Sequence, residues 1–71
     1  MDQAEIDKRF DYHAPTTATK VAAHEVTRGV VKKAAEQLNA ILPESREKAE
    51  TFTLLETALM WANAAIARNQ S

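Results

Sequence analysis

Apolar residues in the last third of the chain recur with the spacing of an α-helix, and from Arg46 onward no glycine or proline interrupts the pattern. One set follows the alternating three- and four-residue spacing of a helix–helix contact: Phe52, Leu55, Leu59, Ala62 and Ile66. A second set is displaced around the same helix: Leu54, Ala58, Trp61 and Ala65. Two apolar stripes require two sets of partners, and the chain offers only one other long helix. The pattern therefore predicts an oligomer.

The other long helix is predicted from about Thr19 to Leu42. Its expected apolar face consists of Val21, Val26, Val30, Ala34, Leu38 and Ile41. Pro43 ends this helix, and Ser45 is the expected N-cap of the next one, where Glu47 complements the helix dipole in the first turn. Because the turn between the two helices has only a few residues, we expect them to lie antiparallel.

The N-terminal segment is polar and acidic, and residues 2–9 predict a short helix. Between Phe10 and Thr19 a loop is expected, because Pro15 disfavours a helical conformation at Ala14. We therefore predict an all-α fold with a single domain, residues 1–71. It consists of a short N-terminal helix and a long antiparallel helical hairpin, assembled as a compact helical oligomer.

Composition and charge narrow the classes of function that the sequence can support. With 71 residues, the chain is near the size at which a single core is thin, and much of its 45% hydrophobic content is alanine. The absence of cysteine fits a reducing cytosol, and neither a membrane-spanning run nor a signal peptide is visible, so we expect a soluble intracellular protein without a membrane partner. A net charge of −1 argues against a binder of nucleic-acid polymers. Residues 16–42 are locally basic, which suits a small anionic ligand.

Catalysis and metal binding find little support. His13 and His24 are eleven residues apart, without the spacing or accompanying cysteine or glutamate of a metal pair. Ser45 is explained as a helix cap, and there is no glycine-rich phosphate loop. We expect neither an enzyme nor a cofactor.

Ligand binding has better candidates. Phe10, Tyr12 and His13 stand in a loop beside Pro15, where aromatic rings either dock the loop onto a helix or stack on a ligand base; composition alone favours docking. Arg28 shares a helix face with Lys32, and such a pair ordinarily belongs to a solvated face. The alternative is that the symmetry of an oligomer brings Arg28 near Tyr12 of another chain.

Three residues of the C-terminal helix are candidates for a role in packing or binding. Trp61 is expected in the core or in an interface, and Asn63 needs a hydrogen-bond partner if it is buried. Arg68 complements the dipole at the helix C-terminus; the alternative is a phosphate ligand held at a symmetry axis.

The residues also resemble a known family, the small bacteriophage anti-CBASS sponges related to a Vs-region protein of T-even phages. The resemblance rests on these segments: Arg9-Phe10-x-Tyr12-His13-x-Pro15, Arg28, Pro43-x-Ser45-Arg46-Glu47-Lys48, Thr53-x-Leu55-Glu56 and Met60-Trp61-Ala62-Asn63-Ala64-x-Ile66-Ala67-Arg68-Asn69. It implies a helical hexamer in the cytoplasm of the infected host. Such proteins sequester cyclic dinucleotides, for example 3′,3′-cGAMP, in pockets between subunits, and cyclic trinucleotides in separate pockets, without cleaving them.

The resemblance implies roles for matching residues only. Tyr12 takes the place of the tyrosine that stacks on the dinucleotide bases, with Phe10 and His13 beside it, and Arg28 takes the place of a phosphate-binding basic residue. Val30 replaces a threonine of the dinucleotide pocket, and Arg68 matches an arginine of the trinucleotide pockets.

Two functions of different classes follow. The first is sequestration of cyclic nucleotides. The second is a small helical protein-interaction module with which a phage binds a host protein.

Overall fold

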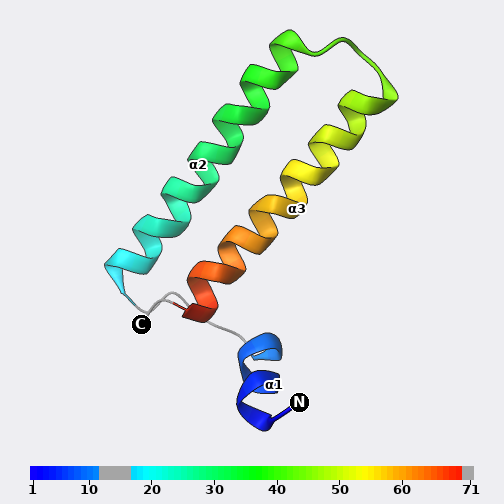
Figure 1. The fold of residues 1–71 in the computed structure, drawn as a ribbon. Helices are drawn as coiled ribbons and strands as arrows, with labels where there is room; N and C mark the ends of the chain where they lie inside the picture. Colours follow the sequence, from blue (N-terminus) through cyan, green and yellow to red (C-terminus); the bar gives the residue numbers. More distant parts are fainter. Residues whose placement is uncertain (12–16, 70–71) are drawn as a thin grey trace.

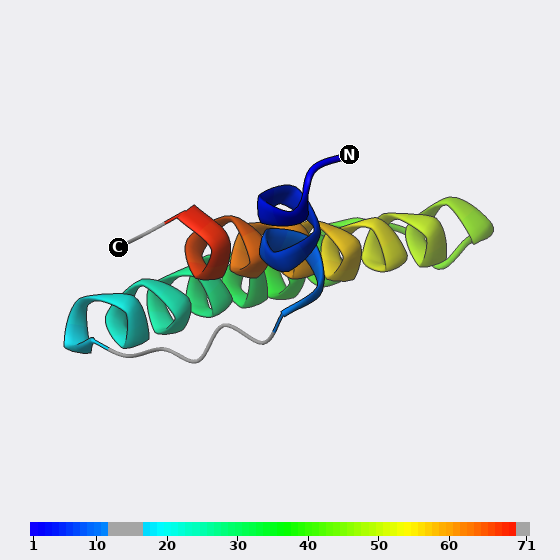
Figure 2. The same cartoon turned by 90° about the horizontal axis from the view of Figure 1, so that it is seen from below.

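The computed structural model describes residues 1–11 and 17–69, and these residues form three helices and no strand: α1 (Gln3–Phe10), α2 (Ala18–Ile41) and α3 (Arg46–Asn69). α2 and α3 form a long antiparallel hairpin, and α1 lies beside the C-terminal end of α3 (Figures 1 and 2). The smallest dimension of the molecule is 12 Å, about the diameter of one helix. The predicted all-α hairpin fold is thus confirmed, and the hairpin is a single layer.

The helices begin at polar caps. The Ser45 hydroxyl accepts a hydrogen bond from the Lys48 backbone N–H at 3.1 Å, which confirms the predicted cap of α3. α2 begins one residue earlier than predicted, because the Thr17 hydroxyl caps it by accepting from the Lys20 N–H at 3.1 Å. At α1 the Asp2 carboxylate accepts from the Glu5 N–H at 2.9 Å.

Both stripes predicted for α3 are observed. The first is half-buried: Phe52, Leu55, Leu59, Ala62 and Ile66. The second is exposed in the single chain, where Leu54 and Trp61 keep 58% and 66% of their surface accessible. The contact between α2 and α3 therefore leaves the second stripe without a partner among the described residues.

The face predicted for α2 is wrong in part. Ala34 and Leu38 are half-buried, but Val21, Val26, Val30 and Ile41 are exposed. The predicted positions are on average four residues apart, so they wind around a helix of 3.6 residues per turn and cannot share one face. Within α2 the half-buried positions are instead Lys20, Ala23, His24, Thr27, Val31, Ala34, Ala35 and Leu38.

Val26 and Val30 lie on the same side of the hairpin as the exposed stripe of α3. Val26 and Val30 each come one position before a half-buried residue of α2. The residues of the exposed α3 stripe likewise each come one position before a half-buried residue of α3. One position is a rotation of about 100°. In two antiparallel helices this rotation turns both stripes toward one side of the layer. We call this side the apolar face: Val26, Val30, Leu54, Ala58, Trp61 and Ala65.

A single chain does not complete a hydrophobic core. No apolar residue of the described ranges is fully buried. The chain exposes 5581 Å², whereas a folded monomer of 7.9 kDa is expected to expose about 4,400 Å².

Among the described residues the buried one is Lys48, in the first turn of α3 beside the hairpin turn, and it is 8% exposed. Its ammonium group donates to the Asn39 carbonyl at 3.1 Å and to the Glu44 carboxylate. Asn39 lies in the last turn of α2, where carbonyl groups lack partners within the helix. Lys48 therefore ties the start of α3 to the end of α2.

We expect Lys48→Met to lower the free energy of unfolding by about 1–3 kcal/mol, because it keeps most of the side-chain volume but leaves the Asn39 carbonyl without its charged donor. Urea denaturation at a fixed protein concentration measures the change. Lys33→Met, at an exposed position of α2, is the matched control and should change stability by less than about 0.5 kcal/mol. Equal stability of the two variants would contradict this role.

Candidate functional site

The C-terminal end of α3 holds α1 through Arg68. The guanidinium Nη2 of Arg68 donates to the backbone carbonyl of Arg9 at 3.0 Å. This carbonyl lies in the last turn of α1, where partners within the helix are missing and the helix dipole is negative. Arg68 therefore caps α1 from outside, in addition to lying at the end of its own helix.

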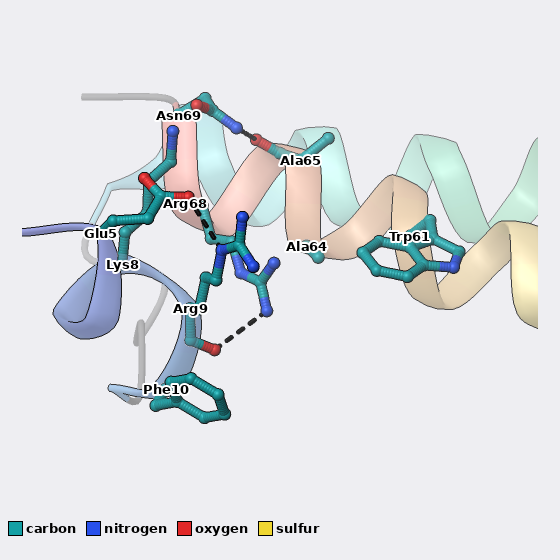
Figure 3. Close-up of a pocket in the computed structure, with 9 residues that line it drawn as sticks. All are labelled: Glu5, Lys8, Arg9, Phe10, Trp61, Ala64, Ala65, Arg68 and Asn69. Atoms are coloured by element: carbon teal, nitrogen blue, oxygen red, sulfur yellow. Dashed lines mark hydrogen bonds and ion pairs between the residues drawn. The ribbon is translucent and has the colours of Figure 1, made fainter. Parts of the chain in front are cut away.

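A cavity of about 520 Å³ opens between α1 and α3 (Figure 3). This volume lies within the range of pockets that hold small molecules. Helix α1 contributes Glu5, Lys8, Arg9 and Phe10, and α3 contributes Trp61, Ala64, Ala65, Arg68 and Asn69.

The lining is positively charged, with three cationic side chains and one carboxylate. The Glu5 carboxylate accepts a hydrogen bond from Arg9 Nε at 2.8 Å. This hydrogen bond holds the pKa of Glu5 below its usual value of 4.5, and the charges of Arg9, Lys8 and Arg68 act in the same direction. Glu5 is therefore ionised at neutral pH, and the cavity carries an excess of positive charge.

Two aromatic rings border these charges. Phe10 is 79% exposed at the end of α1, and Trp61 is 66% exposed on α3. In Figure 3 the guanidinium groups of Arg9 and Arg68 lie between the ring of Trp61 and the side chains of Glu5 and Lys8. Guanidinium groups bind phosphate oxygens with two parallel hydrogen bonds, and exposed rings stack on bases. The cavity thus has the chemistry to hold a ligand with phosphates and flat rings.

The structure places the residues predicted for ligand binding in different ways. Phe10 and Arg68, assigned to different ligands, line the same cavity of one chain. Arg28 is exposed in the middle of α2 and does not line this cavity. Tyr12 and His13 lie outside the described residues.

Three of the lining residues were not predicted from the sequence, namely Glu5, Lys8 and Arg9, and Trp61 was predicted in the core or an interface. The sequence signal that could have identified this site was Arg9-Phe10, a cation followed by an aromatic ring in the last two positions of α1. No pattern indicated that the C-terminal end of α1 lies next to the last turns of α3.

Asn63 has the hydrogen-bond partner that the sequence analysis required. His24 Nδ1 lies 2.9 Å from Asn63 Oδ1, and both side chains are half-buried between α2 and α3. Because an amide oxygen only accepts, the ring nitrogen is the donor. His24 is therefore occupied within the hairpin. No group of three or more histidine, aspartate or glutamate side chains in the described ranges could hold a metal ion.

Comparison with known families decides the relationship. The sequence model of the Acb2/Tad1 hairpin domain matches residues 2–67, nearly the whole chain. The chain belongs to the Acb2/Tad1 family. This confirms the resemblance to the anti-CBASS sponges, a phage family known for binding cyclic nucleotides rather than for an enzymatic activity. We found no match among curated proteins or among solved structures. In the described part of this Acb2/Tad1 protein, neither long helix has an apolar stretch that would let it cross a bilayer.

Proposed function

We propose that this protein is a phage immune-evasion protein that sequesters cyclic di- and trinucleotides, such as 3′,3′-cGAMP, without cleaving them, and thereby blocks CBASS signalling in the host cytoplasm. The observation that carries the proposal is the family match over residues 2–67. The cationic, aromatic cavity between α1 and α3 supports it, because phosphates and bases require such a lining.

The proposed working form is a homo-oligomer, with six chains as in the sponge family. The exposed surface exceeds that expected of a folded monomer by about 1,200 Å². A stable interface typically covers about 800 Å² on each partner. The apolar face supplies suitable side chains, since Leu54 and Trp61 are large and exposed. A second copy covering this face would complete the core.

The proposed dinucleotide site combines Tyr12, His13 and Phe10 with Arg28 of another subunit. Arg28 is exposed and lies on a different helix from Phe10, which agrees with a site shared between chains. Val30 is 63% exposed, but positions two residues apart in a helix do not face each other. Val30 and Arg28 of one chain therefore point to different sides of α2, and they share a pocket only if two chains contribute to it.

The proposed trinucleotide site is the cavity around Arg68. Lys8 and Arg9 add positive charge there. Three copies of this cavity around a threefold axis would present one arginine to each phosphate of a cyclic trinucleotide.

The exposed apolar face also favours the second function, a module that binds a host protein. The two functions differ in what covers this face. In a sponge a second copy covers it, whereas in an interaction module it stays exposed until the host protein binds.

The first test concerns assembly. We expect Leu54→Glu to weaken self-association at least hundredfold, about 3 kcal/mol, because it places an unpaired charge in the proposed interface. Sedimentation measures the mass. Thr53→Glu adds the same charge at the exposed neighbouring position and should leave the oligomer intact. Leu59→Glu should instead unfold the hairpin, since Leu59 is half-buried between the helices. A monomeric parent chain would defeat the assembly proposal.

The second test separates the two sites by calorimetry. Arg28→Ala should weaken 3′,3′-cGAMP binding about ten- to hundredfold, the loss of a charged hydrogen bond worth roughly 1.5–3 kcal/mol, and should spare cyclic triadenylate. Arg68→Ala should do the reverse. Tyr12→Ala should weaken only dinucleotide binding, by about 1–3 kcal/mol per stacked base. Arg46→Ala, exposed at the start of α3, is the control. Equal loss of both ligands in the Arg68 variant would merge the two sites into one.

The third test addresses cleavage. After incubation with excess protein and denaturation, chromatography should recover the cyclic nucleotide unchanged. Linear or hydrolysed products from pure protein would replace the sponge proposal with a phosphodiesterase.

A further inference from the structure

Glu5 occupies an unusual place for a carboxylate in a cavity proposed to bind an anion. It is the acidic residue among the nine that line the cavity. Its carboxylate accepts from Arg9 Nε at 2.8 Å, within the same lining that holds Lys8 and Arg68. A carboxylate at this point competes with a phosphate for the guanidinium donors of Arg9.

The local helix geometry does not require this arrangement. Asp2 and Glu5 have the spacing of a capping box, in which the glutamate turns back to the backbone N–H of the cap residue. Here the Asp2 half of the box is formed, since Asp2 accepts from the Glu5 N–H, while the Glu5 side chain extends forward to Arg9. The Glu5–Arg9 ion pair therefore forms part of the cavity lining in addition to stabilising α1.

We infer that Glu5 is an internal competitor that occupies the Arg9 guanidinium in the free protein and is displaced by a phosphate of the bound cyclic trinucleotide. The inference rests on the proposed trinucleotide site. Without ligand, Glu5 offsets part of the repulsion among Lys8, Arg9 and Arg68. With ligand, Arg9 exchanges a carboxylate for a phosphate, so displacing Glu5 subtracts a small amount from the affinity of the anion. Glu5 thus adjusts the affinity of the cavity for phosphate.

The side chains of Arg9 and Glu5 are 50% and 41% exposed, and this exposure limits how much their ion pair can change the affinity for a ligand. Solvent-exposed ion pairs are weak, so their removal changes affinity only modestly. We expect Glu5→Gln to tighten binding of cyclic triadenylate about two- to fivefold in calorimetry near 0.15 M salt. Glutamine keeps the side-chain length and remains compatible with the start of a helix.

Asp7→Asn provides the matched control. Asp7 lies on the same helix and loses the same charge, but its carboxylate accepts from Gln3 at 2.7 Å and does not line the cavity. Any general effect of net charge appears in both variants, so the difference between them isolates competition at Arg9. In an Arg9→Gln background the gain from Glu5→Gln should vanish. Binding of 3′,3′-cGAMP should respond equally to Glu5→Gln and Asp7→Asn.

The outcomes separate this inference from the proposed function. If the parent chain binds cyclic triadenylate and Glu5→Gln behaves like Asp7→Asn, the competition at Glu5 is disproved and the sponge function stands. A gain that persists without Arg9 also disproves it. If the parent chain binds neither cyclic nucleotide, the proposed function fails and the role of Glu5 fails with it.

Discussion

The narrow contact between α2 and α3 is the interaction on which the rest of this structure depends. Alanine and β-branched side chains dominate the α2 side, and Phe52, Leu55 and Leu59 supply much of the volume from α3. Small side chains let two helices approach closely, but they bury little apolar area. The hairpin consequently remains one layer thick, with its apolar face open. Helix α1 is held in turn by the end of α3, so the cavity exists only where the hairpin is formed.

Much of the fold could be predicted from the sequence because the relevant signals are local. Pro43, Ser45 and an uninterrupted helical pattern were enough to place the turn and α3. The face of α2 was not predictable in the same way. Valines suggested a stripe, yet Val26 and Val30 are exposed, while Lys20 is half-buried and His24 is hydrogen-bonded to α3. Several polar side chains of α2 have long or flat apolar portions that can be buried in a helix contact. A hydrophobicity scale does not show whether such a side chain or a valine will occupy the buried position.

The candidate site followed from the sequence only in part. Arg68 and Phe10 were singled out one residue at a time, but their meeting in one cavity depends on the docking of α1, a contact between segments almost sixty residues apart. No periodicity encodes such a contact. Arg28 illustrates the complementary limit, since the proposed dinucleotide site is shared between chains and would be incomplete in any one of them. In the proposed function the protein does not consume its ligand and acts stoichiometrically, so shared sites would also tie binding capacity to assembly.

The hydrogen bond between His24 and Asn63 has a consequence for the hairpin as a whole. Because the α2 side of this contact is rich in alanine, apolar packing alone specifies the register of the two helices weakly. A single polar pair changes this, because a slip of one turn, about 5.4 Å, would leave a half-buried ring nitrogen and an amide oxygen without each other. In coiled coils one buried polar residue fixes the register in the same way. His24 and Asn63 thereby set how far α2 reaches along α3, and with it where Arg28 stands relative to the end of the hairpin that carries Arg68.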